Sequence, residues 1–146
     1  MNRYLVIALF TLTLLPSCGA SPVDTGKALA KAACESNADD YLKHFDLDRF
    51  AERYLEKGYG ATFQNLSDTK RNDAIHKFAS ELEAAIRKSA VPEDGTPADC
   101  DAKIELVREG DKEARITYET PLAKPMTMIL EKIDGQWKIV GYEKSR

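Results

Sequence analysis

Few residues in this sequence have the types and spacing that chemistry needs. The two histidines, His44 and His76, fall in different expected helices, and neither has another ligand at the spacing of a metal pair. Tyr41, His44 and Asp48 could share one helix face, which would orient an imidazole for acid or base work, but such helical neighbours are common. We therefore expect both histidines at the surface or its boundary, and we assign no catalytic residue, metal or cofactor.

The carboxylates, serines and glycines likewise form no clear catalytic or phosphate-binding pattern. Asp99 and Asp101 flank Cys100, and on a strand they would share one face about 7 Å apart, which is more typical of a solvated strand start than of a glycosidase pair. No serine stands in a nucleophile-elbow pattern, and Gly58 and Gly60 are followed by no lysine at the spacing of a phosphate loop. Hydrolase and nucleotide-binding functions gain no support.

The first seventeen residues differ in kind from the rest of the chain. Arg3 is followed by an uncharged, mainly apolar run from Leu5 to Leu15. This pattern is typical of a secretory leader. The run is well short of the roughly 20 residues that a permanent membrane-spanning helix needs, so we expect it to be removed.

The residues after the leader, Leu15, Pro16, Ser17 and Cys18, resemble the lipobox of bacterial lipoproteins. The resemblance implies cleavage before Cys18 and a lipidated cysteine, whose several acyl chains suffice for stable anchoring. Gly19, in place of aspartate, implies transfer to the outer membrane, with the domain facing the periplasm. The alternative is an ordinary signal peptide cut near Ala20, with Cys18 lost.

The expected organisation is a signal peptide over residues 1–17, a lipidated cysteine and tether over 18–23, and one domain over 24–146. The net charge of the whole chain is −3, and removal of Arg3 with the leader makes it −4. Such mild acidity favours neither nucleic acid nor an anionic membrane surface as a partner. Cys34 and Cys100 then remain as a pair in an oxidising compartment, where we expect a disulfide; two separate buried thiols are the alternative.

Three helical segments are expected in the first part of the domain. Asp24 or Thr25 caps the first helix, which has a break near Asn37 and extends toward Phe45. Asp46 caps the second, which Gly58 and Gly60 stop, and Ser67 or Asp68 caps the third, which ends before Pro92. Apolar residues recur at helical spacing in the last two helices: Leu47, Phe50, Tyr54 and Leu55, then Ile75, Phe78, Leu82 and Ile86.

After Cys100 the apolar residues alternate with polar ones, which predicts strands. Turns are expected at Gly110-Asp111, over Pro121–Pro125 and at Asp134-Gly135, the last being a strong cue for a tight hairpin. Four consecutive short strands should form an antiparallel meander. The predicted fold is therefore α+β, with N-terminal helices packed on one face of a C-terminal four-stranded antiparallel sheet.

This order of elements, with a closing hairpin that continues through Trp137-Lys138-Ile139-Val140, resembles the nuclear transport factor two-like superfamily of cone-shaped α+β folds. The resemblance implies a curved sheet wrapped around a long helix, leaving a pocket. A narrower likeness is to the periplasmic phospholipid-carrier family. It rests on the apolar helical positions Phe50, Tyr54, Leu55, Phe78 and Leu82, although the sequence lacks that family's trailing helical segment after the last strand.

These observations leave three functional hypotheses. The first is a nonenzymatic envelope module that binds a protein partner, in one form an immunity or inhibitor protein. The second is an anchored binder of lipid or another small apolar ligand, and the third is an isomerase-like enzyme of the same superfold. For the binding surface or pocket we select Tyr54, Tyr118, Met128, Trp137 and Tyr142, while a packed core is the alternative reading of the sheet residues.

Overall fold

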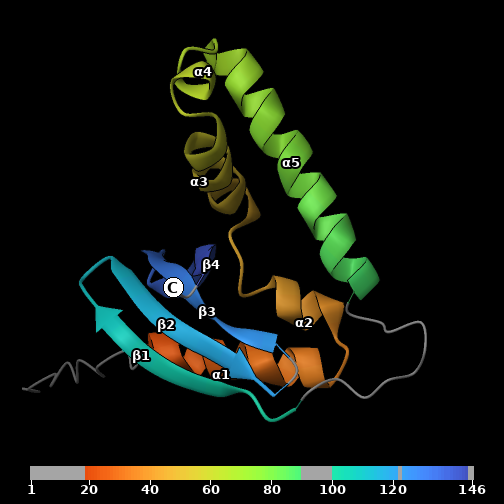
Figure 1. Cartoon of the computed structure of the whole chain (residues 1–146), viewed down its shortest axis with the longest axis vertical. Coiled ribbons are helices and arrows are strands. Elements are labelled where there is room, and N and C mark those ends of the chain that lie inside the picture. Colours follow the sequence, from red (N-terminus) through yellow and green to blue (C-terminus); the bar gives the residue numbers. More distant parts are fainter. Residues whose placement is uncertain (1–18, 90–99, 122, 145–146) are drawn as a thin grey trace, which may run out of the picture.

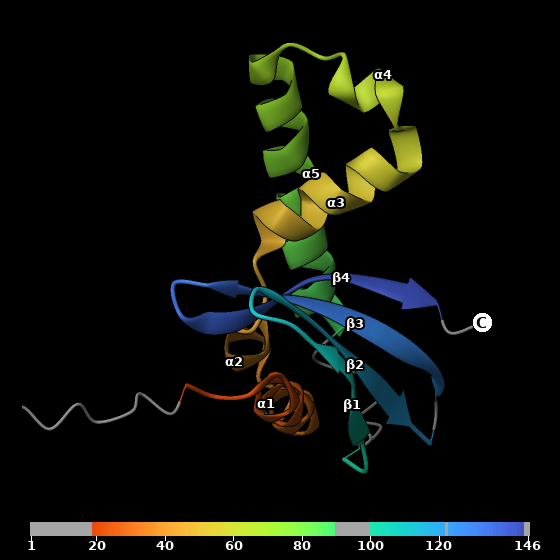
Figure 2. The same cartoon turned by 90° about the vertical axis from the view of Figure 1, so that its left-hand side faces the viewer.

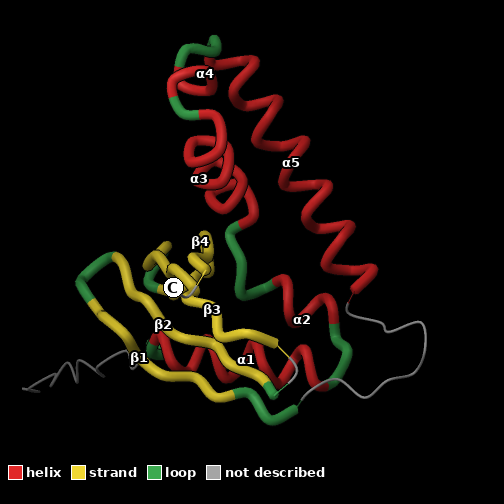
Figure 3. The backbone as a smooth tube through the Cα atoms, in the orientation of Figure 1, coloured by secondary structure: helices red, strands yellow, loops and turns green. Residues whose placement is uncertain are grey.

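The structure is a computed structural model that describes residues 19–89, 100–121 and 123–144. Helices come first and strands follow (Figure 1, Figure 3). The elements in chain order are α1 (Pro22–Cys34), α2 (Ala38–Leu42), α3 (Leu47–Tyr59), α4 (Ala61–Gln64), α5 (Asp68–Ser89), β1 (Lys103–Glu109), β2 (Glu113–Thr120), β3 (Ala123–Ile133) and β4 (Gln136–Lys144).

The four strands form one antiparallel sheet in the order β1-β2-β3-β4, so the predicted meander is confirmed. The tight hairpin between β3 and β4 is also confirmed, because Asp134 and Gly135 take φ angles of 50° and 79°, as a type I′ turn requires. The expected turn over 121–125 is wrong in part, since β3 begins at Ala123. Pro125 fits the strand because it lies just before Met126, where pairing with β4 starts.

Helix α1 packs on one face of the sheet and encloses a hydrophobic core with it (Figure 2). The contact is close: a Cβ added to Gly26 would lie 2.6 Å from Cδ1 of Ile116 and 2.9 Å from Cγ2 of Ile104. Any larger residue at position 26 would therefore force these isoleucine side chains to shift, and glycine allows the close approach of helix to strand without strain. The buried residues of this sheet core are Leu29, Ala114, Ile116, Met128, Leu130, Trp137 and Ile139.

Helix α1 begins earlier than the sequence analysis predicts. Ser21 is the N-cap, because its hydroxyl accepts from the backbone N–H of Asp24 at 3.1 Å and its own N–H donates to the Asp24 carboxylate at 3.0 Å. Asp24 is thus the third helical residue of a capping box, and the prediction that Asp24 or Thr25 is the cap is wrong. Pro22 and Val23, which were expected to belong to the tether over 18–23, are therefore part of α1, and Pro22 is buried.

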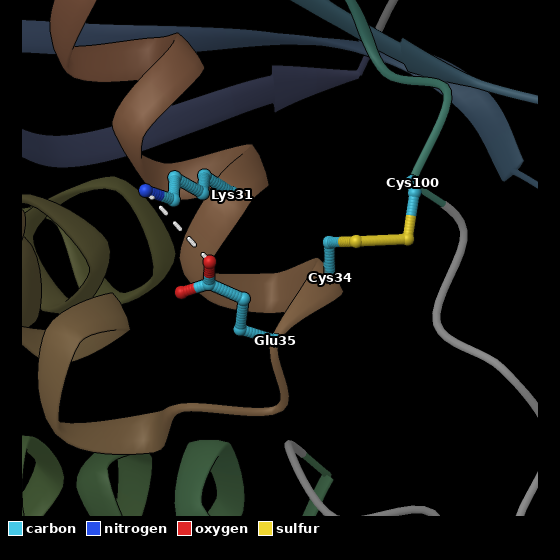
Figure 4. The surroundings of a disulfide bond; sticks show 4 residues. All are labelled: Lys31, Cys34, Glu35 and Cys100. Atoms are coloured by element: carbon cyan, nitrogen blue, oxygen red, sulfur yellow. Dashed lines mark ion pairs between the residues drawn. A yellow bond between two sulfur atoms is a disulfide. The ribbon is translucent and has the colours of Figure 1, made fainter.

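A disulfide joins the end of α1 to the segment before β1, as predicted. Cys34 and Cys100 have Cα atoms 4.9 Å apart and a sequence separation of 66 (Figure 4). The predicted helix break is also confirmed, because Ser36 has φ 52° and the Asn37 side chain caps α2 by accepting from the N–H of Asp40. The disulfide therefore holds the helix that covers the sheet to the first strand of the same sheet.

Helices α3, α4 and α5 form a helical hairpin that stands off the sheet (Figure 1). Asp46 caps α3 as predicted, and α3 continues past Gly58 to Tyr59, with Gly60 as its C-cap. The predicted packing of helices on the sheet is confirmed for α1 and α3, whereas α5 packs chiefly on α3 and α2. The apolar residues of the hairpin instead bury one another; this hairpin core consists of Ala51, Leu55, Phe63, Ile75 and Ala79.

The chain just before α3 is hydrogen-bonded to the edge of β4. The N–H of Ile139 donates to the carbonyl of His44 at 2.8 Å, and the N–H of Asp46 donates to the carbonyl of Ile139 at 3.1 Å. Lys138 adds a bond from its ammonium to the carbonyl of Lys43 at 2.6 Å. Because Asp46 is also the N-cap of α3, these bonds fix where the hairpin leaves the sheet.

Several predictions fall on parts of the chain outside the described residues. The leader, Cys18, the loop with Pro92 and the acid Asp99 are among them. Cleavage, lipidation and the outer-membrane location therefore stay predictions. Within residues 19–89, 100–121 and 123–144, no helix is both long and apolar enough to span a bilayer.

Candidate functional site

Three of the five residues selected for a binding surface belong to the sheet core. Trp137 is 6% exposed and Met128 is 5% exposed, and Tyr118 packs against the same cluster. Met126, another residue that could line a pocket, also packs there. These side chains are therefore structural, and they fill the region between α1 and the sheet where a cone-shaped fold would keep its pocket.

An isomerase site inside this region would need a carboxylate beside an inward tyrosine. Tyr41 and Tyr118 both pack on the sheet core, and burial raises the pKa of Tyr41 to about 12, with a smaller contribution from the nearby Tyr118. Among the residues that the structure describes, the buried polar side chain is Thr25, which is not an acid. The phenols are present, but the structure places no buried carboxylate with them in the described part of the chain.

The other two selected residues, Tyr54 and Tyr142, lie together in an open cleft. Each is 47% exposed, and they come from α3 and β4 respectively. The cleft has a volume of about 640 Å³ and lies between α3 and the strands β3 and β4. The residues that line it are Arg49, Phe50, Glu52, Arg53, Tyr54, Glu56, Lys57, Ile129, Glu131, Gly141, Tyr142 and Glu143.

A chain of aromatic contacts positions the Tyr142 side of this cleft. The ring of Phe50 lies 5.8 Å from that of Tyr142 and 6.3 Å from that of Phe45, which in turn lies 5.3 Å from Tyr41. These spacings fall within the range of favourable aromatic pairs. Because Phe45 and Tyr41 pack on the sheet core, the chain of rings connects the cleft wall to that core.

Ion pairs join the two walls of the cleft. Arg53 of α3 donates to Glu131 of β3 at 2.6 Å and lies 3.5 Å from Glu113 of β2. Arg115 of β2 lies 3.2 Å from Glu143 of β4 and 3.5 Å from Glu113. The charges at the base of the cleft are therefore largely neutralised within the protein, and a bound molecule would find an aromatic surface edged by charges of both signs.

Sequence reasoning missed the role of Arg53 and Glu131. They are 78 residues apart, and each has the charged, polar character of any surface position in its element. The signal that could have found them is the cluster of basic and aromatic residues on one side of α3, where Phe50, Arg53 and Tyr54 follow at spacings of three and one. That spacing indicates that the three side chains lie on one side of α3. It does not indicate which other element that side of the helix faces.

A second hollow lies inside the helical hairpin. It has a volume of about 320 Å³ and a mainly apolar lining. Tyr59, which is 62% exposed, stands at this groove, while Phe78 of its lining stacks on Tyr54 with ring centroids 4.7 Å apart. The hairpin groove is lined by Leu55, Tyr59, Thr62, Phe63, Leu66, Ala74, Lys77, Phe78 and Glu81.

The histidines do not form the trio that Tyr41, His44 and Asp48 could have made. Asp48 instead faces His76 of α5, with Nδ1 and Oδ1 3.3 Å apart, and both side chains are well exposed. Burial lowers the pKa of His44 below its ordinary value, and the nearby Lys138 adds to this. His76 is at the surface as expected, and water surrounds its pair with Asp48.

The described residues hold no cluster of three or more histidine, cysteine or acidic side chains that could bind a metal ion. Within those residues, the site residues that remain after removal of the core positions are the tyrosines and charged groups of the cleft. This set can bind and orient a partner, because tyrosine supplies both an apolar ring and a hydrogen-bonding hydroxyl.

Comparisons with known proteins address the fold. No family model matches the sequence, and no curated protein matches it significantly. A crystal structure of an NTF-2-like protein of unknown function from Shewanella oneidensis MR-1 is similar, with 16% identity and a TM-score of 0.50. The match covers 82% of this chain and 92% of that one. Helices followed by a four-stranded antiparallel sheet thus form an NTF-2-like α+β fold, as the sequence predicted.

Proposed function

We propose that this chain is a nonenzymatic, lipid-anchored module of the bacterial envelope that holds a protein partner in the cleft between α3 and the sheet. The observation that carries the proposal is the position of Tyr54 and Tyr142, two half-exposed tyrosines on opposite walls of one open cleft. Exposed tyrosine on a rigid support is typical of protein interfaces, because its ring contributes contact area at a small cost in conformational entropy.

The composition of the cleft favours a protein segment over a small apolar ligand. Its edges carry Arg49, Lys57, Glu52 and Glu56, so a ligand must meet charges of both signs. Small apolar ligands prefer an enclosed, apolar pocket with few polar groups. A polypeptide with mixed side chains fits the cleft better, and an extended or helical segment can lie between the two walls.

The interior of the fold gives the lipid-carrier alternative less support. A carrier needs space between the covering helix and the sheet, and there Gly26 of α1 lies so close to Ile116 that one added methyl group would force the isoleucine to shift. Leu29, Ile116 and Leu130 are fully buried at the same interface. The superfold analogy with isomerases likewise lacks a carboxylate in the core beside Tyr41 and Tyr118 among the described residues.

The proposal is tested with the full-length chain, carrying a C-terminal affinity tag and produced in a bacterial host. Two variants are compared with it: Tyr142→Ser removes an aromatic wall of the cleft, and Tyr59→Ser removes a tyrosine that is more exposed, 62% against 47%, from the hairpin groove. Complexes are purified from envelope extracts in mild detergent, washed in moderate salt and identified by mass spectrometry. Metabolic labelling with palmitate, with Cys18→Ser as the control, tests the anchor in the same cells.

The expected result is an envelope protein that the unmodified chain and the Tyr59→Ser variant retain equally, and that the Tyr142→Ser variant retains at least about tenfold less. Loss with Tyr59→Ser alone would place binding in the hairpin groove and contradict the proposed site. Phospholipid that co-purifies in a one-to-one ratio with every variant would favour the lipid-binding alternative. A partner that is a toxin, held through the salt wash, would identify the immunity form of the module.

A further inference from the structure

The start of the described chain lies against the turn between β3 and β4. A Cβ built on Gly19 would be 3.5 Å from the carbonyl oxygen of Gly135. Two residues later the chain is fixed, because Ser21 closes the capping box with Asp24 and Pro22 is fully buried. The segment from Gly19 to Ser21 can reach at most about 10 Å even when fully extended.

This turn belongs to one end of the sheet. In an antiparallel meander the first and third turns lie at the same end, and here the N–H of Lys132 donates to the carbonyl of Lys112 at 2.9 Å, which joins the two. We call the residues Gly110–Lys112, Asp134–Gln136 and Gly19 the anchor end. Figure 2 shows the β3–β4 turn on the side where the described chain begins, and the C-terminal end of β4 on the other side.

The cleft extends from the β3–β4 hairpin toward the opposite end of β4. Its Glu131 lies three positions before Asp134, about 10 Å along the strand, whereas Gly141, Tyr142 and Glu143 come five to seven positions after Gln136, about 17–23 Å along the strand. The part of the cleft at Tyr142 is therefore separated from the tether by most of the length of β4.

From this geometry we infer that the anchor end rests on the bilayer surface and that the cleft opens away from it, toward a partner in the aqueous space. The inference rests on the proposed lipidation of Cys18, which is the residue just before Gly19. An acyl chain attached there brings the β3–β4 turn to the headgroups, because the tether is too short to let the domain turn over.

The contact depends on the anchor and not on charge. The exposed ionisable residues at and beside the two turns are four acids, Glu109, Asp111, Glu113 and Asp134, and two bases, Lys112 and Lys132. Basic residues attract a protein surface to an anionic bilayer, and here the acids outnumber them. We therefore expect the orientation on neutral phosphatidylcholine vesicles, where charge attraction plays no part.

The chain offers a clean labelling experiment. Cys34 and Cys100 are bonded to each other and Cys18 carries the lipid, so a cysteine introduced elsewhere is the reactive thiol for a fluorescent label. Gln136→Cys places the label at the anchor end, and Glu119→Cys places it at the far end of β2, where the side chain is also exposed. Each full-length, lipidated protein is reconstituted into phosphatidylcholine vesicles that contain lipids with a nitroxide on the headgroup.

The expected result is quenching at Gln136→Cys that is at least about threefold stronger than at Glu119→Cys. Insertion of a flexible ten-residue Gly-Ser linker between Ala20 and Ser21 should abolish the difference, because the short tether is its cause. Equal quenching at the two sites, or none at either, in protein whose mass shows the lipid would overturn the orientation while leaving the anchor intact. Protein without the lipid mass would instead refute the anchored part of the proposed function.

Discussion

Arg53 of α3 and Glu131 of β3 form a direct link between the helical hairpin and the sheet, with the guanidinium nitrogen 2.6 Å from the carboxylate oxygen. The same arginine lies 3.5 Å from Glu113, and Glu113 and Glu131 are cross-strand partners in the β2–β3 register. Two carboxylates directly opposite each other repel. Arg53 therefore neutralises a pair of like charges and holds one wall of the cleft over the other.

Replacement of Arg53 by methionine tests this link. We expect Arg53→Met to lower the free energy of unfolding by about 1–2 kcal/mol, because it exposes the repulsion between Glu113 and Glu131 as well as removing two ion pairs. Part of the loss should return in high salt, which screens that repulsion. Urea denaturation at low and high salt measures both effects.

Arg49→Met is the matched control for that experiment. Arg49 lines the same cleft, but the structure gives it an ion pair with Glu52 of its own helix, at 3.5 Å. Exposed pairs within a helix contribute about 0.3–0.5 kcal/mol, so this variant should change stability little. A loss for Arg49→Met equal to that for Arg53→Met would contradict the role assigned to Arg53.

The Cys34–Cys100 bond closes a long loop that contains the whole helical hairpin. The chain-entropy model assigns a loop with a sequence separation of 66 a stabilisation of about 4 kcal/mol. We expect the double variant Cys34→Ser/Cys100→Ser to lose an amount of that order in urea denaturation. Reductant should destabilise the unmodified protein by the same amount and leave the double variant unchanged; a difference below about 1 kcal/mol would contradict the model.

The sequence predicted the parts of this fold that local patterns determine. Caps such as Asp46, the Asp134-Gly135 turn and the alternation of Ile116 with polar neighbours report directly on backbone geometry, and the structure agrees at each. The start of α1 was missed because serine, aspartate and threonine are all common N-cap residues, and the apolar pattern after Asp24 did not show that Pro22 is buried.

Those local patterns could not predict which elements pack against each other. Apolar periodicity showed that α3 and α5 each have a buried face, but either the sheet or the partner helix could cover it, and the two helices cover each other. For the same reason, the residues selected for a binding site include both core residues and cleft residues. Alternation on a strand marks Trp137 and Met128 as inward without distinguishing a core from a pocket, whereas Tyr54 and Tyr142 line one cleft from elements that are far apart in the sequence.

The buried phenol of Tyr41 predicts a loss of stability in alkali. Its pKa is raised from 10.0 to about 12 by burial, so between these values the unfolded chain has lost the proton while the folded chain keeps it. Stability must then fall as the pH rises through this window, by at most about 1.4 kcal/mol per pH unit.

Tyr41→Phe removes the titrating group while keeping the ring that packs on Phe45. We expect its free energy of unfolding to fall less steeply than that of the unmodified protein between about pH 10 and pH 11, and the two slopes to agree near neutral pH. Denaturant titrations at several pH values measure the difference. Parallel curves across the whole range would show that Tyr41 ionises as freely in the folded state as in the unfolded one.

Gly26 provides the most direct test of how tightly α1 packs on the sheet. An alanine there would place a methyl group 2.6 Å from Cδ1 of Ile116, so we expect Gly26→Ala to destabilise the fold by about 1–3 kcal/mol despite the higher helix propensity of alanine. Gly58→Ala is the control, because that helical position has no atom within 4 Å of an added Cβ and should gain about 0.5–1 kcal/mol.

The same close contact can be relieved from the other side. Ile116→Val deletes the Cδ1 atom that an alanine at position 26 would meet, so in the double variant Gly26→Ala/Ile116→Val the two changes should destabilise less than the sum of the single effects. Urea denaturation of the four proteins in this cycle gives the coupling energy. Additive effects, or a stabilising Gly26→Ala, would mean that space exists between α1 and the sheet. Such a result would support a ligand pocket there.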